Sequence, residues 1–156
     1  MKKILACVIM AVLVLGCLTG CSTEFAAEEY DDNEKIAKTD HNVELGGSGG
    51  SLNDIMTKKS SKFNGRTTLG EVTVGTPTEI DVILNMSCSD GKAKLVLVDC
   101  DDNVYKIYEI TPENNTTDGY VEGTMTVPTG RNKIKLVGVD CKDLVLEMSV
   151  TGCKWE

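Results

Sequence analysis

From residue 63 to the C-terminus, apolar and polar residues alternate with a period of two in short runs. Such alternation predicts strands that bury one face and expose the other. In one run, for example, Ile80, Val82, Leu84 and Met86 share a face. The predicted strands are Thr67–Val74, Glu79–Ser87, Lys92–Cys100, Val104–Thr111, Tyr120–Val127, Asn132–Cys141 and Leu144–Cys153.

Residues typical of turns separate these runs. Ser89-Asp90-Gly91 indicates a hairpin, and Lys142-Asp143 indicates a turn between the last two strands. No sustained helical pattern interrupts the strands. The sequence therefore predicts that residues 63–156 form an antiparallel β-sandwich of about seven to eight strands, closing two sheets over one core.

The preceding segment, residues 21–62, differs in composition. Residues 22–45 hold eight acidic residues against two lysines, and residues 46–51 read Gly-Gly-Ser-Gly-Gly-Ser. Apolar residues are few and form no stripe that would dock a helix. We interpret the segment as a disordered acidic tether, and expect residues 63–155 to fold without it. It either lifts the domain from a membrane or serves for attachment alone.

The N-terminus has the organisation of an export signal, assigned to residues 1–20. Lys2 and Lys3 precede an uncharged apolar run of thirteen residues, 4–16. That run is too short to cross a bilayer, which takes about 20 residues. Leu18-Thr19-Gly20-Cys21 follows and resembles the bacterial lipobox, in which the cysteine receives a diacylglyceryl group. The alternative is an ordinary secretory signal with an incidental cysteine.

Lipidation at Cys21 would place the protein on the cell membrane, facing the extracytoplasmic side, with the membrane as its partner through the lipid. Two or more acyl chains suffice for stable anchoring. The formal net charge is −8, and no basic patch is present. Binding to nucleic acid therefore has no electrostatic basis in this sequence.

Two segments of the domain echo each other. Residues 91–99 read Gly-Lys-Ala-Lys-Leu-Val-Leu-Val-Asp, and residues 130–138 read Gly-Arg-Asn-Lys-Ile-Lys-Leu-Val-Gly. With these two patterns, residues 63–152 resemble the C-terminal β-sandwich of small lipoproteins of Firmicutes. The resemblance implies the fold; it implies no activity and assigns no role to any residue. The four cysteines of the domain depart from it.

Catalytic candidates are few. His41 is the only histidine and falls in the predicted tether, which removes the usual Ser-His-Asp and Cys-His arrangements. The turn aspartates Asp99–Asp102 and Asp140–Asp143 could act as paired carboxylates, but aspartate is common in turns for backbone reasons. No catalytic residue is assigned, and the protein is predicted not to be an enzyme.

No cofactor or metal is assigned either. The segment starting at Asp99 begins like a calcium loop, but Val104 and Ile110 stand where such a loop needs glycine and glutamate. A looser calcium site shared by the turns at Asp99 and Asp140 remains open. Zinc bound by the cysteines lacks the usual close spacing of ligands.

Aromatic residues that could stack on a sugar are scarce. Tyr105 and Tyr108 are three apart in one predicted strand, so we expect them on opposite faces. Trp155 is either an exposed stacking group or a lid over the sandwich.

Four cysteines remain in the domain: Cys88, Cys100, Cys141 and Cys153. If the two similar segments align in the same direction, Cys88 meets Cys153 at one end of the sandwich and Cys100 meets Cys141 at the other. We therefore predict these two disulfides, with four free thiols as the alternative.

These observations together predict a non-enzymatic lipoprotein of the cell envelope. Its β-sandwich would bind a protein or glycan or have a structural role. The alternative is an envelope enzyme or calcium-dependent adhesin that uses the turn aspartates.

Overall fold

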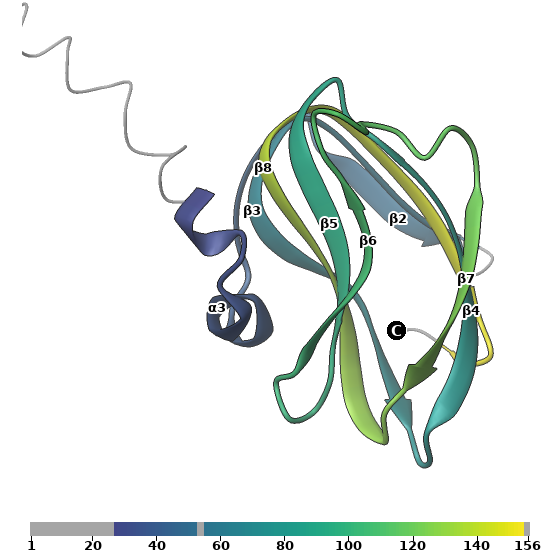
Figure 1. Ribbon diagram of the computed structural model, residues 1–156. Coiled ribbons are helices and arrows are strands. Elements are labelled where there is room, and N and C mark those ends of the chain that lie inside the picture. The colour runs from purple at the N-terminus through teal and green to yellow at the C-terminus, as the bar shows by residue number, and fades with distance from the viewer. Residues whose placement is uncertain (1–26, 53–54, 155–156) are drawn as a thin grey trace, which may run out of the picture.

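The computed structural model describes residues 27–52 and 55–154 (Figure 1). The described elements in chain order are helix α3 (Asn33–Lys38) and strands β1 (His41–Leu45), β2 (Ser48–Leu52), β3 (Ile55–Val74), β4 (Thr78–Ser87), β5 (Asp90–Val98), β6 (Val104–Ile110), β7 (Val121–Val127) and β8 (Gly130–Thr151).

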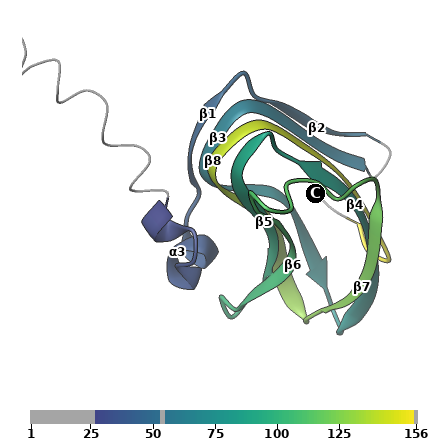
Figure 2. The same cartoon turned by 45° about the horizontal axis from the view of Figure 1, so that its top comes forward.

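Two long strands organise the molecule. β3 and β8 pair antiparallel along almost their whole length and arch over from one layer into the other (Figures 1 and 2). Where residues 62–74 pair with 130–142, the strand order is β1-β3-β8-β5-β6. Where residues 55–60 pair with 144–149, the order is β2-β3-β8-β4-β7. The predicted antiparallel β-sandwich is confirmed.

The arch requires unusual backbone conformations at a few positions. Gly65 has φ of +116°, and a Cβ there would collide with the carbonyl oxygen of His41. Asp140 and Asp143 flank the bend in β8 with φ of 52° and 48°. Aspartate tolerates this left-handed region better than most residues. The predicted turn at Lys142-Asp143 is therefore wrong: the strand bends there and continues.

The core lies between the two layers, as the alternation predicts. Ile80, Val82, Leu84 and Met86 are all buried in it. The predicted hairpin at Ser89-Asp90-Gly91 is wrong, however, because β4 and β5 do not pair. Each pairs with a different half of β8, so this connection crosses from one layer to the other.

The acidic N-terminal segment packs on the outer face of the first layer, where Figure 2 shows α3 beside the sandwich. Asp32 caps the helix, its carboxylate accepting a hydrogen bond from the Lys35 amide. Tyr30, Ile36 and Ala37 are buried against valines of β5 and β8. This second apolar cluster consists of Tyr30, Ile36, Ala37, Val96, Val98, Val137 and Val139.

Buried charges strengthen the same contact. Glu29 forms an ion pair with Arg66 of β3, and both side chains are 5% exposed. The Lys135 ammonium donates to the carbonyl oxygens of Ile36 and Thr39, at 2.7 and 2.9 Å. Burial tends to raise the pKa of the Glu29 carboxyl, but hydrogen bonds from Arg66 and Lys35 bring that pKa below its usual value. The segment is thus bound by specific contacts.

The tether interpretation and the boundary at residue 62 are therefore wrong for the described part of the segment. Residues 48–52, which include much of the Gly/Ser run, form β2 and pair with β3. The boundary itself falls inside β3, whose residues 55–62 belong to the paired strand. Composition predicted disorder here, but backbone hydrogen bonds and a few buried side chains hold the segment in place without a long apolar stripe.

Candidate functional site

A cleft opens where the edges of the two layers face each other. β6 is the edge of the first layer and β7 the edge of the second, and each pairs with only one other strand among the described elements. The cleft between them has a volume of about 210 Å³. Its walls are formed by residues of β4, β6 and β7, namely Val82, Leu84, Lys106, Ile107, Tyr108, Val121, Glu122, Gly123, Thr124 and Met125.

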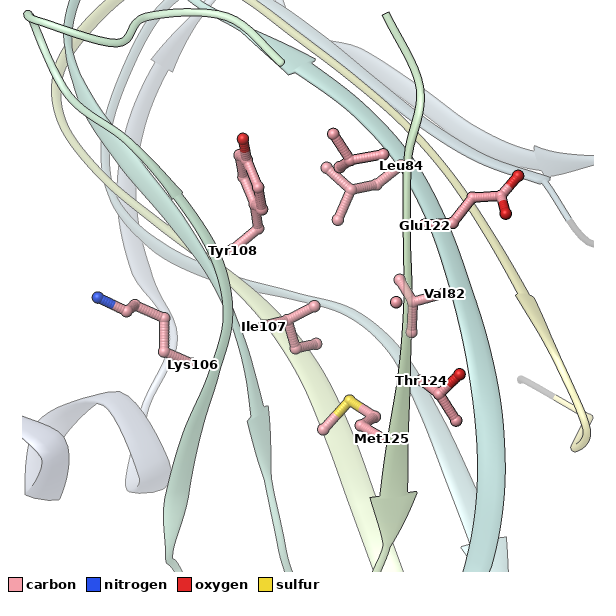
Figure 3. Close-up of a pocket in the computed structure, with 10 residues that line it drawn as sticks. Val82, Leu84, Lys106, Ile107, Tyr108, Glu122, Thr124 and Met125 are labelled. Atoms are coloured by element: carbon pink, nitrogen blue, oxygen red, sulfur yellow. The ribbon is translucent and has the colours of Figure 1, made fainter.

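The interior of the cleft is apolar. Val82 and Leu84, at its base, are 3% and 2% exposed and belong to the core. Ile107, Tyr108 and Met125 are half-buried and pack on the same core, and Figure 3 shows them pointing into the space between the strands. The cleft therefore extends to the edge of the hydrophobic core, where half-buried side chains cover Val82 and Leu84.

Polar residues lie around the cleft and point away from it. In Figure 3 the side chains of Lys106 and Glu122 are directed outward from β6 and β7. Lys106 pairs with Glu109 at 2.7 Å, and the hydrogen bond to this carboxylate raises the pKa of the lysine. The Thr124 hydroxyl lies 3.0 Å from an Asp81 carboxylate oxygen. The polar residues thus form the rim, and the Tyr108 hydroxyl is the polar group inside.

Glycine at position 123 accounts for the empty space. Along β7, Val121, Gly123 and Met125 pair with Leu84, Val82 and Ile80 of β4, whose side chains all face the core. Directly opposed residues share a face of the sheet. Gly123 therefore stands at a core-facing position with no side chain, and a Cβ built there meets nothing within 4 Å.

A bulge in β6 shapes the opposite wall. Leu95 pairs with Tyr108 and Val96 with Lys106, which leaves Ile107 without a partner in the register. An extra residue reverses the alternation beyond it. Tyr108 and Tyr105 consequently oppose Leu95 and Leu97, both core residues, and share one face. The prediction that these tyrosines face opposite sides is wrong, because nothing in the sequence marks the bulge.

The turn aspartates occupy opposite ends of the sandwich. Val98, next to Asp99, pairs with Lys133, whereas Asp140 lies further along β8. About seven strand residues separate these levels, or about 23 Å. A calcium site shared by the two turns is therefore excluded. No group of three His, Cys, Asp or Glu side chains in the described ranges is placed to hold a metal ion.

The Asp99 carboxylate stabilises the turn in which it lies. It accepts hydrogen bonds from the amides of Asp101 and Asn103 and from the Tyr105 hydroxyl, at 2.9 to 3.0 Å. Burial tends to raise the pKa of this carboxyl, but these bonds and the one from the Asn103 side chain lower it below its usual value. Asp99 therefore has a structural role in the β5–β6 hairpin.

His41 belongs to the folded domain, contrary to the sequence-based expectation. It begins β1 and pairs with Arg66 of β3. It does not line the cleft between β6 and β7.

The four domain cysteines are not bonded to one another in the structure, and their placement contradicts both predicted disulfides. Cys100 lies beside Gly130 at one end of β8, whereas Cys141 is eleven residues further along that strand, or about 36 Å. Ser87 pairs with Val145, which places Cys88 about 25 Å along β8 from Cys153. The two similar segments do not align as expected, because β5 runs antiparallel to β8.

Cys21 and Trp155 lie outside the described residues, so the structure does not test the lipobox or the lid. Within the described ranges, none of the helices is long and apolar enough to span a bilayer.

Comparison with known proteins gives similarity only at the level of architecture. No family model matches the chain, and no curated protein matches it. Among solved structures, a variant of a family 29 carbohydrate-binding module is 14% identical with a TM-score of 0.41, covering 74% of this chain and 82% of that one. A xylan-binding module of family 15 is 11% identical with a TM-score of 0.39, covering 73% and 97%. Similarity at this level does not identify a ligand.

Proposed function

We propose that this protein is a lipid-anchored, extracytoplasmic binding protein that catalyses no reaction. An apolar group of its ligand occupies the cleft between β6 and β7. The observation that supports the binding role is Gly123, which leaves a core-facing position of β7 empty, so that the cleft extends to Val82 and Leu84. Filling this space removes apolar surface from water, which favours binding.

The dimensions of the cleft limit the ligand. A volume of about 210 Å³ is below the range of about 300–1,000 Å³ usual for whole small molecules. It suits one apolar group, such as a peptide side chain or the end of an acyl chain, while the rest of the ligand stays at the polar rim. Free edges of β6 and β7 supply backbone hydrogen-bonding groups there.

The aspartate-based alternative has less support. Asp99 is committed to its turn, and the aspartates at 140 and 143 lie at the other end of the sandwich. The Asp143 carboxylate accepts a hydrogen bond from Ser89 at 2.8 Å, and that of Asp140 from Asn64 at 3.2 Å.

The binding role is tested by nuclear magnetic resonance with a panel of short apolar peptides, fatty acids and oligosaccharides. A ligand of the cleft shifts the backbone signals of Val121, Gly123 and Tyr108. Gly123→Leu fills the cleft and abolishes these shifts, whereas Thr126→Ala, at an exposed position of the same strand that does not line the cleft, preserves them. Binding that survives Gly123→Leu would refute the proposed site.

The anchor is tested separately. Cys21→Ala removes the thiol that would carry the lipid, so we expect the protein to leave the detergent phase of a Triton X-114 extraction and to remain unprocessed. Cys17→Ala, in the same segment, serves as the control and retains normal processing. Unchanged partitioning of Cys21→Ala would contradict lipidation.

A further inference from the structure

Two of the four domain cysteines meet at the bend of β8. Cys88 directly follows β4, and Cys141 lies in the bend itself. The Sγ atom of Cys88 is 3.7 Å from the carbonyl oxygen of Gly91, and that of Cys141 is 3.0 Å from the carbonyl oxygen of Lys92. The two thiols are thus held beside the carbonyl oxygens of two successive residues at the start of β5.

We propose that Cys88 and Cys141 form a disulfide bond in the exported protein. The proposal rests on the export that the N-terminal segment indicates, because disulfides persist in oxidising compartments. It is independent of what the cleft between β6 and β7 binds. It also differs from both pairings expected from the sequence.

The backbone around the pair is already fixed. The Cys88 amide donates to the carbonyl oxygen of Asn115 at 3.0 Å, and the Ser89 amide donates to that of Lys142 at 2.8 Å. These bonds attach the β4–β5 connection to the bend of β8. A disulfide needs its two residues close and fixed in orientation, and these backbone hydrogen bonds fix the connection that carries Cys88 against the bend that carries Cys141.

The other cysteines have no such neighbour. Cys100 is exposed at the opposite end of the first layer, where its Sγ lies 3.3 Å from the Thr129 carbonyl oxygen. Cys153 is half-buried just after the end of β8, about eight strand residues from the level of Cys88. Cys88 and Cys141 are therefore the two that the fold brings together.

The reaction is a thiol–disulfide exchange with a disulfide donor, such as oxidised glutathione or a disulfide oxidoreductase. One cysteine thiolate attacks the donor and forms a mixed disulfide, and the second thiolate then displaces the remaining donor sulfur. The S–S bond of the donor breaks, the Cys88–Cys141 bond forms, and two electrons and two protons leave with the donor as two thiols.

Burial determines when the exchange takes place. Cys88 and Cys141 are 4% and 1% exposed, and burial raises the pKa of both thiols, that of Cys141 to about 12. Thiolates are the reacting species, so exchange in the folded protein is slow. A depression of about 520 Å³ is lined in part by Phe63, Cys141 and Lys142, and Cys88 does not line it. The bond therefore forms during folding and then resists reduction.

Peptide mapping of the full chain tests the proposal in two arms. In the first, the protein is exported by its own signal in a bacterial host, extracted from the membrane, alkylated under denaturing conditions and digested. In the second, purified protein is refolded in a buffer of oxidised and reduced glutathione. Both arms should yield the peptides of Cys88 and Cys141 joined, with a mass about 2 Da below their sum. The second arm does not depend on export.

Variants extend the test to stability. With a reductant present during unfolding, the melting temperature of the wild type and of Cys100→Ala/Cys153→Ala should fall by about 10 °C, because the closed loop is long. Cys88→Ala/Cys141→Ala should show no such fall. Alkylation of both residues in each arm, or a bond from either one to Cys100 or Cys153, would overturn the proposal.

Discussion

Replacing Gly123 by valine should stabilise the fold and impair the binding site at the same time. Gly123 faces the core from β7, opposite Val82, and a Cβ added there meets nothing within 4 Å. Its φ lies outside the left-handed region, so a side chain brings no backbone strain. Valine also has a high preference for strands.

The gain can be estimated from two contributions. Glycine in the middle of a strand costs about 0.5–1 kcal/mol relative to alanine through backbone entropy. Burying a valine side chain completely contributes about 1.5–3 kcal/mol, and we take about a third of that because the cleft is open on one side. The free energy of unfolding should therefore rise by about 1–2 kcal/mol, and the melting temperature by about 4–8 °C.

Thermal and urea unfolding measure this gain, and the ligand panel measures the loss of binding. Gly123→Ala is the matched control, since it removes the entropic cost of glycine but leaves most of the cleft empty. It should gain up to about 1 kcal/mol and keep its ligand. A valine variant that is less stable than wild type, or that binds as tightly as Gly123→Ala, would show that the missing side chain at Gly123 does not create the cleft.

Three further predictions concern the charges. Glu29→Gln should cost about 3 kcal/mol by leaving Arg66 buried without its counter-ion, whereas the exposed Glu28→Gln should cost nothing measurable in urea unfolding. Asp99→Ala should cost about 2 kcal/mol through the unsatisfied donors of its turn. The pKa values of the Glu29, Asp40 and Asp99 carboxyls are lowered in the folded protein. The stability that these carboxylates contribute should therefore be complete above about pH 5 and be lost as the pH falls below about 4. An acid titration monitored by circular dichroism that shows no change down to about pH 2 would contradict this.

The alternation of apolar and polar residues was sufficient to predict the sandwich, because a strand that buries one face leaves a period of two. It identified the core face of β4 and the two runs that form β5 and β6. It could not show which strands pair. The patterns of β4 and β5 are compatible with a hairpin. In the structure they belong to different layers, because each pairs with a different half of the long strand β8.

The N-terminal segment shows a different limit. A segment rich in acidic residues and glycine is disordered only when its few apolar side chains have no apolar surface to pack against. Here the outer face of the first layer offers a patch of valines, and Tyr30 and Ile36 cover it. The lysines and the arginine that meet Glu29, Asp31 and Asp40 come from β3, β5 and β8. These partners are far apart in sequence, so no local pattern reveals them.

The cleft also depends on non-local information. A period of two places Gly123 on the same face as Val121 and Met125, so the missing side chain is visible in the sequence. That it leaves a cleft depends on β6 and β7 both being edges of their layers and on the bulge at Ile107. In the middle of a layer, neighbouring side chains would close the same gap.

The docked N-terminal segment alters what a lipid at Cys21 would do. About eight residues separate Cys21 from Glu29, which is buried against Arg66. Fully extended, they span at most about 29 Å. A tether running to residue 62 would let the domain move far from the bilayer, whereas this short connection would hold a lipid-anchored domain close to the bilayer by the side bearing α3. Because the same segment supplies buried contacts of the fold, a force applied through such an anchor would act first on Glu29 and Tyr30. Lipidation at Cys21 would thus link anchoring to stability through residues that composition alone assigns to a passive linker.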